Sequence, residues 1–224
     1  DIRDISAQLM QYYAQAGRRF PNCRGLDPID EPVVGWTDEP MAEAFHKATG
    51  LEAPAKDDRS DLGRYAAYQV FRNHVLNDFN LEMRDAMREV TPEADFTIQM
   101  MPGTLTRSGL YPAGNTSHDL NSVHIYDHWP SSNNGMAFFA NLNRANRKVF
   151  WDRRQQVFTG CYGIAPDQWR AAWALAMSAK VEGHGYFLGA GELDPSLPWV
   201  EISLAEMVRI NRLCERYGDF FLAL

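Results

Sequence analysis

Two adjacent carboxylates, Asp30 and Glu31, are the first candidates for chemistry in this sequence. They close the segment Cys23–Pro32 (CRGLDPIDEP), in which a short apolar run ends in two acids and a proline. The segment predicts a strand over 23–30, with both acids at its carboxyl end. A partly desolvated carboxylate at such a position can have the raised pKa that a general acid needs. The pattern therefore favours acid–base catalysis, and a solvated loop start is the structural alternative.

Further polar and aromatic residues fall at the ends of two later predicted strands. Tyr126, Asp127, His128 and Trp129 close the segment that predicts a strand over 121–127. Trp151 and Asp152 close KVFWD, which predicts a strand over 148–152, and Trp36 follows the first strand. Flat tryptophan faces at these positions suit stacking on sugar rings, and loop packing is the alternative for each of them.

The densest group of metal-ligand types is His118, Asp119, His124, Asp127 and His128. Alternate residues of a strand share one face, so His124 and His128 could converge on an ion. A metal site generally needs three or four ligands with supporting partners, and this spacing does not specify them. We therefore predict no metal and interpret Asp127 and His128 as a sugar-binding rim. A metal-dependent hydrolase built on this group stays open.

The periodicity of apolar residues predicts alternating helices and strands. The predicted helices cover 2–16, 41–48, 68–90, 135–143 and 166–180, with a last helix opened by a capping box at Ser203 and Glu206. The predicted strands cover 23–30, 95–101, 121–127, 148–152 and 185–188. The long loops follow strands, which is typical of a (β/α)8 barrel with its functional loops on one face. The first strand lacks the glycine-rich phosphate loop of dinucleotide-binding folds.

Asp30-Glu31-Pro32 resembles the Asn-Glu-Pro motif of clan A glycoside hydrolases, which are retaining enzymes built on a (β/α)8 barrel. The order of later segments is similar to that of family 42 β-galactosidases. Val123–Pro130 resembles the sixth strand, and residues 148–187 resemble the seventh strand, its helix and the eighth strand. The resemblance implies an α/β fold of TIM-barrel type in which residues 1–224 form a single partial domain, from the third helix to the eighth. The first three βα units would then be missing from this chain.

The resemblance also implies roles for the candidate residues. Glu31 is the expected general acid/base of a retaining reaction on a β-linked glycan or galactoside. Asp152 is the expected nucleophile, in a place where the family has a glutamate, and Asp30 stands where the family has an asparagine. The residues expected to position the sugar are Asp30, Trp36, Tyr126, Asp127, His128, Trp129 and Trp151. The departure at the nucleophile keeps a second function open, a catalytically inactive carbohydrate-binding barrel.

Composition excludes several classes of partner. The chain has 224 residues, with 29 acidic against 22 basic side chains and a net charge of −7, which disfavours binding to a phosphate backbone. No apolar run approaches the roughly 20 residues of a membrane span. The three cysteines are far apart, so they predict neither a disulfide framework nor a zinc site and leave a secreted or periplasmic location open. We expect a carbohydrate substrate, and no cofactor, nucleic acid or membrane partner.

Five parallel strands cannot close an eight-stranded barrel, so the outer strands would keep unpaired backbone groups. We expect them to be covered either by the missing amino-terminal part of the barrel or by a second copy in a homo-oligomer. The isolated chain should therefore be oligomeric or aggregate in size-exclusion chromatography with light scattering. An active monomer that unfolds cooperatively would contradict the partial-barrel interpretation.

Overall fold

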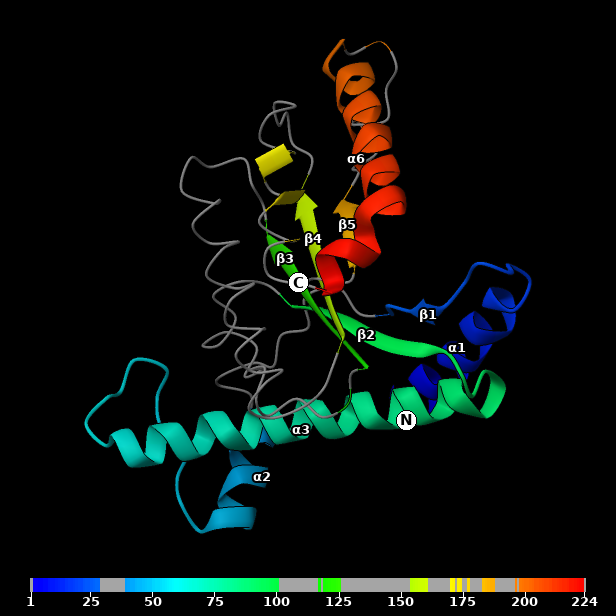
Figure 1. Ribbon diagram of the computed structural model, residues 1–224. Coiled ribbons are helices and arrows are strands. Elements are labelled where there is room, and N and C mark those ends of the chain that lie inside the picture. Colours follow the sequence, from blue (N-terminus) through cyan, green and yellow to red (C-terminus); the bar gives the residue numbers. More distant parts are fainter. Residues whose placement is uncertain are drawn as a thin grey trace. The chain divides into compact units, whose positions relative to one another are not determined.

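The computed structural model divides into two compact units, which are considered separately below: an amino-terminal unit, residues 1–120, and a carboxyl-terminal unit, residues 121–224. Within them the structure describes residues 2–28, 39–100, 117, 119–125, 154–160, 170–171, 173–174, 177, 183–187, 196 and 198–223. The amino-terminal unit contains α1 (Ile2–Gly17), β1 (Gly25–Leu26), α2 (Glu39–Thr49), α3 (Leu62–Val90) and β2 (Asp95–Met100) (Figure 1). Then follow β3 (Leu120–Ile125), β4 (Arg154–Gly160), β5 (Gly183–Phe187) and α6 (Pro198–Ala223).

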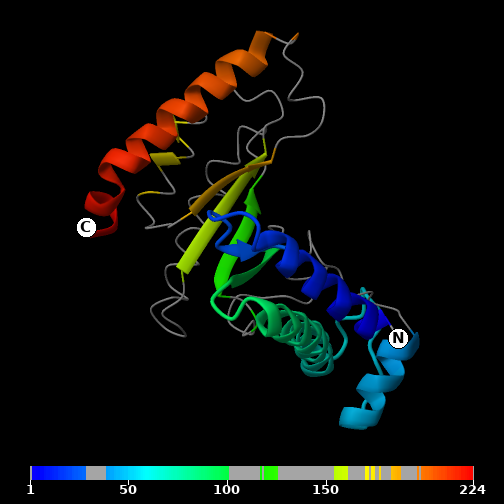
Figure 2. The same ribbon diagram turned by 90° about the vertical axis from the view of Figure 1, so that its right-hand side faces the viewer.

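The core of the amino-terminal unit lies between α1, α3 and β2. α1 runs beside the carboxyl-terminal part of α3 (Figures 1 and 2). The buried residues of this core come from all three elements: Met10 and Ala14 from α1, Met83, Ala86 and Met87 from α3, and Phe96 and Ile98 from β2. The apolar burial of these side chains holds α1 and β2 on the same helix.

The helix predicted over 2–16 is confirmed, but the side that it buries is not the side that carries Ile2 and Tyr12. Met10 and Ala14 are buried, whereas Ile2 and Tyr12 keep 75% and 64% of their surface exposed. The spacing that predicts a helix therefore does not show which side meets the core, since two apolar faces lie next to each other on α1.

α3 is longer than predicted because its amino-terminal cap lies outside the apolar pattern. The Asp61 carboxylate accepts a hydrogen bond from the Arg64 backbone nitrogen at 2.9 Å, so the helix begins at Leu62 rather than at residue 68. Its end at Val90, just before Thr91 and Pro92, is as predicted.

One side of α3 is polar and yet buried. Arg72, Asn73 and Asn80 are at most 1% exposed, and Asn77 is 5% exposed. Desolvation by burial lowers the pKa of Arg72, while Tyr68 and Tyr65 act in the opposite direction. Of these side chains, Asn77 holds neighbouring backbone through a hydrogen bond that is described below.

Two strand pairs, β1–β2 and β4–β5, are parallel, as predicted. In the amino-terminal unit Gly25 is opposite Asp95, and Leu26 is opposite Phe96. In the carboxyl-terminal unit the strand order is β3-β4-β5, and β4 pairs with β5 from Gln156 opposite Gly183 onwards. No described helix in either unit is long and apolar enough to cross a membrane.

Two predictions in the carboxyl-terminal unit are wrong. β4 lies in a segment for which no strand is predicted, while the strand predicted over 148–152 lies outside the described residues. Ser203 is not a helix cap, because α6 begins at Pro198. Glu206 instead pairs with Arg209 at 2.6 Å and with Arg170 at 3.3 Å. Proline is favoured in the first turn of a helix, which explains the earlier start.

Gly25 allows β1 and β2 to approach closely. A Cβ atom at this position would lie 2.5 Å from the Asp95 carbonyl oxygen and 2.9 Å from the Asp95 Cβ. The nearest obstacle is backbone, which cannot rotate away as a side chain can. Only glycine therefore fits this register.

We predict that Gly25→Ala lowers the free energy of unfolding by about 1–3 kcal/mol, the usual range for an overpacked site. Urea denaturation followed by circular dichroism measures the change. Gly63→Ala is the control in the same unit, because its Cβ would meet only the Asp61 carboxylate at 3.4 Å. Equal stability of the Gly25 variant and the wild type would show that β1 does not need this close approach.

Candidate functional site

The predicted acid/base follows the carboxyl end of β1. The strand ends at Leu26, and Asp30, Glu31 and Trp36 come after it in the chain. All three lie in 29–38, outside the described residues. Their order after a parallel strand is the order that the barrel interpretation requires, because active-site residues follow the carboxyl ends of barrel strands.

The residues predicted after the third strand have the same relation to β3. This strand ends at Ile125, and Tyr126, Asp127, His128 and Trp129 follow directly. They also lie outside the described residues. Their distances to Glu31 therefore stay predictions.

Trp151 and Asp152 have the opposite relation to their strand. Both lie outside the described residues, and β4 begins at Arg154, two residues after Asp152. Asp152 thus precedes the described strand, whereas the prediction placed it at a carboxyl end. If Asp152 is the nucleophile, its carboxylate must lie at the carboxyl ends of the strands, where a barrel has its active site, although Asp152 comes before β4 in the chain.

The chain that follows β4 offers no replacement carboxylate nearby. Residues 161–166 read CYGIAP, and Asp167 is the first acid after the strand. A retaining glycosidase needs two carboxyl groups close together. The two-carboxylate mechanism therefore depends on Asp152, and the positions of Asp152 and Glu31 both stay predictions.

One member of the predicted metal-ligand group has a different role. The Asp119 carboxylate pairs with Arg88 at 2.8 Å and accepts a hydrogen bond from the Phe96 backbone nitrogen, also at 2.8 Å. The Asp119 backbone nitrogen donates in turn to the Phe96 carbonyl at 2.9 Å. Both carboxylate oxygens are thus engaged in joining α3 and β2 to the start of β3, which leaves Asp119 a poor metal ligand.

Ser117 is held from α3 as well. Its backbone nitrogen donates to the Asn77 side-chain oxygen at 3.1 Å, and its carbonyl accepts from Arg84 at 3.4 Å. Sequence reasoning missed this role of Asn77, Arg84 and Arg88, because it treated the helix as an apolar pattern. The signal was present as polar residues spaced three, four and seven apart along a long helix.

The described residues contain no group of three or more metal-ligand side chains. His124 is on β3, and His118 and His128 lie outside the described residues. The metal-dependent alternative therefore loses Asp119 and gains no described ligand in its place.

The sequence matches no known protein-family model and no curated protein sequence. Among solved structures, the crystal structure of a β-galactosidase from the psychrophilic Marinomonas ef1 is similar, with a TM-score of 0.70 and 15% sequence identity. The match covers 100% of this chain and 45% of the β-galactosidase chain. At this identity the likeness concerns the fold: this chain is folded like a part, less than half, of that β-galactosidase.

We predict that Asp119→Asn lowers the free energy of unfolding by about 1–3 kcal/mol, because it removes a charge-assisted bond to the Phe96 amide and the pair with Arg88. Asp85→Asn is the matched control: Asp85 pairs with Arg84 at 3.3 Å, but its side chain is 67% exposed, so the change should be below about 1 kcal/mol. Thermal unfolding with and without a chelator completes the test. A stability that depends on a divalent metal, and that Asp119→Asn makes metal-independent, would restore the metal interpretation.

Proposed function

We propose that this chain is part of a (β/α)8 barrel of the glycoside hydrolase type and that it acts on a β-linked glycan or galactoside. The observation that supports the proposal most is the fold likeness to part of a β-galactosidase over the whole chain. The likeness agrees with the resemblance of Asp30-Glu31-Pro32 to the acid/base motif of clan A, which rests on the sequence alone. The parallel pairs β1–β2 and β4–β5 are of the kind that such a barrel uses.

Glu31 is proposed as the general acid/base. In the first step of a retaining reaction, its carboxylic acid donates a proton to the glycosidic oxygen as the bond to the sugar breaks. In the second step, its carboxylate takes a proton from the attacking water. Asp30, Tyr126, Asp127, His128 and the tryptophans are proposed to hold the sugar, through hydrogen bonds and ring stacking.

Asp152 is the proposed nucleophile, since the resemblance requires a carboxylate in this part of the chain. It would attack the anomeric carbon on the face opposite the leaving oxygen, and water would later release the covalent intermediate. Arg153 and Arg154 follow directly in the chain, and a neighbouring guanidinium favours the ionised form of a carboxylate.

The second candidate function is a barrel that binds carbohydrate without hydrolysing it. The position of β4 specifically favours this candidate, because Asp152 precedes the strand and no acid occurs in 161–166. A glycoside hydrolase barrel that has lost its nucleophile would keep the sugar-binding rim.

We predict that Glu31→Gln strongly reduces hydrolysis of glycosides with poor leaving groups, by about 10²–10⁴-fold, the usual contribution of general acid–base catalysis. Aryl β-galactosides with an acidic phenol should lose less in the first step, because their leaving oxygen needs little protonation. Pre-steady-state kinetics on both substrate types measures that step. Glu52→Gln, at an exposed surface position, is the control and should hydrolyse both at the wild-type rate. Equal losses on both substrates would assign Glu31 another role.

We predict that Asp152→Ala abolishes turnover and that added azide restores it. Azide would attack the anomeric carbon in place of the missing carboxylate and give a glycosyl azide of inverted configuration, which nuclear magnetic resonance identifies. Wild-type turnover in this variant would exclude Asp152 as nucleophile. Sugar binding by a wild-type protein that hydrolyses no β-glycoside would favour the carbohydrate-binding candidate instead.

A further inference from the structure

α1 leaves a stripe of apolar side chains exposed along its length. The members of the stripe recur three or four residues apart, so they share one face of the helix. Isolated exposed apolar side chains are ordinary, but a continuous row of them marks an interaction surface. We call this row the outer stripe, and it consists of Ile2, Ile5, Leu9, Tyr12 and Tyr13, which are 44–75% exposed.

The outer stripe lies on the side of α1 that faces away from α3. Met10 and Ala14 are buried in the core with α3 and β2. The Gln11 side-chain nitrogen donates to the Glu89 carboxylate of α3 at 2.6 Å, which also marks the inner side. Ile5 comes nine residues before Ala14, and nine residues are two and a half turns of an α-helix. The core and the outer stripe therefore occupy opposite sides of one helix.

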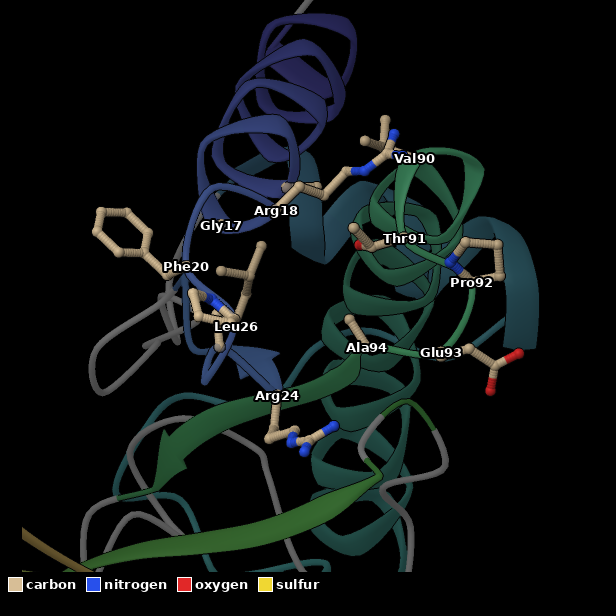
Figure 3. Close-up of a pocket in the computed structure, with 13 residues that line it drawn as sticks. Gly17, Arg18, Phe20, Arg24, Leu26, Val90, Thr91, Pro92, Glu93 and Ala94 are labelled. Carbon is tan, nitrogen blue, oxygen red and sulfur yellow. The ribbon is translucent and has the colours of Figure 1, made fainter.

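The exposed apolar surface continues past the last turn of α1. Phe20 follows the helix and keeps 66% of its surface exposed. Figure 3 shows the Phe20 ring directed away from Val90 and Thr91 at the end of α3, whereas the Arg18 side chain extends towards Val90. The apolar surface thus runs from Ile2 to Phe20.

The two tyrosines of the outer stripe are of the kind that protein interfaces favour. Their ring centroids are 5.9 Å apart, and the rings meet edge-on. A tyrosine ring buries apolar area while its hydroxyl group can stay in water at the rim of an interface, and tyrosine is enriched in such interfaces. The outer stripe therefore fits a protein partner.

The charges at the two ends of α1 select the direction of a partner helix. Asp4 lies in the first turn, Arg19 follows the last turn, and both are exposed. A second copy of α1 in the antiparallel direction brings Asp4 of each copy near Arg19 of the other, whereas a parallel copy brings like charges together. Antiparallel alignment also places opposite ends of the two helix dipoles side by side.

An antiparallel register exists that matches the apolar residues as well. When Leu9 lies opposite Tyr13 of the second copy, Ile2 lies opposite Phe20, and Asp4 comes within one residue of Arg19. Both copies use the same surface in this arrangement, so a two-fold axis closes the assembly as a dimer.

The outer stripe is also large enough for a stable pair. A single tyrosine can bury about 150–250 Å². Five large apolar side chains that are 44–75% exposed therefore present several hundred Å² per copy, and Phe20 adds to it. A standard interface buries roughly 600–1,000 Å² per partner.

We infer that the outer stripe of α1 binds a second copy of this chain in an antiparallel dimer with two-fold symmetry. Leu9, Tyr12 and Tyr13 form its apolar centre, and Asp4 of each copy pairs with Arg19 of the other at its rim. Of the two covers expected for a partial barrel, the complementary charges favour the second copy over a missing amino-terminal part. The inference does not depend on the proposed glycosidase activity.

Sedimentation velocity of the full chain over a wide range of concentration tests the dimer. Ile5→Glu and Leu9→Glu should each raise the dissociation constant at least about tenfold, because each copy would bury a carboxylate against the apolar centre. Leu62→Glu, on α3, is the matched control and should dimerise like the wild type. Leu62 is 68% exposed and Ile5 is 65% exposed, so the two changes are alike except in their place.

A charge exchange tests the direction of the two helices. Asp4→Arg and Arg19→Asp should each weaken the dimer about threefold to tenfold, since each change sets like charges side by side at two symmetric places. The double variant should regain the wild-type dissociation constant. The two residues lie at opposite ends of α1, so a contact within one copy does not explain such a recovery.

A chain that stays monomeric at every concentration overturns the inference. A dimer that Leu62→Glu weakens as much as Ile5→Glu overturns it too, as do folded Ile5→Glu and Leu9→Glu variants that dimerise like the wild type. Failure of the double exchange to restore the dimer overturns the antiparallel arrangement. A monomer that binds phospholipid vesicles through Leu9 would assign the outer stripe to a membrane surface instead. Circular dichroism checks that each variant is folded, as expected for substitutions at exposed positions.

Discussion

The close approach of β1 to β2 at Gly25 is the constraint on which the first strand pair of the amino-terminal unit depends. A side chain at residue 25 would collide with the Asp95 carbonyl, so the register of Gly25 with Asp95 and of Leu26 with Phe96 requires glycine. β1 has only two residues, and a short strand has few ladder hydrogen bonds to resist a shift. A change of register by one residue would turn every following side chain to the other face. The strand that precedes the motif Asp30-Glu31-Pro32 in the chain is therefore held in register by Gly25.

α3 is the second support, because most elements of the amino-terminal unit are held on it. Its apolar side packs against Met10 and Phe96, and its aromatic residues Tyr68 and Phe71 meet Phe45 of α2 edge-on. Its polar side reaches Ser117 and Asp119 at the entry to β3. One long helix thus holds the chain before β1, the strand β2 and the start of β3.

The sequence predicted the helices of the amino-terminal unit, because apolar spacing and breakers such as Thr91-Pro92 act locally, whereas the helix predicted over 135–143 lies outside the described residues. It predicted the start of α3 late, since Asp61 caps the helix from a polar segment without apolar period. It did not predict β4 over Arg154–Gly160, because RQQVFTG is less apolar than KVFWD, and pairing with β5 is a non-local contact that no local pattern reveals.

The candidate site also has a part that the sequence could predict and parts that it could not. Glu31 could be proposed from three adjacent residues, since the motif is contiguous. The nucleophile could not be, because its role depends on a distance between residues far apart in the chain, and local sequence does not determine such a distance. The structural role of Asp119 could not be predicted either, since its partners Arg88 and Phe96 belong to two other elements.

The most direct test of the account is the distance between the carboxyl groups of Glu31 and Asp152 in a crystal structure of the protein with a bound sugar. A retaining mechanism predicts about 5–5.5 Å, with the anomeric carbon between the two groups. A separation of more than about 10 Å, beyond even the spacing of an inverting pair, would contradict the two-carboxylate mechanism.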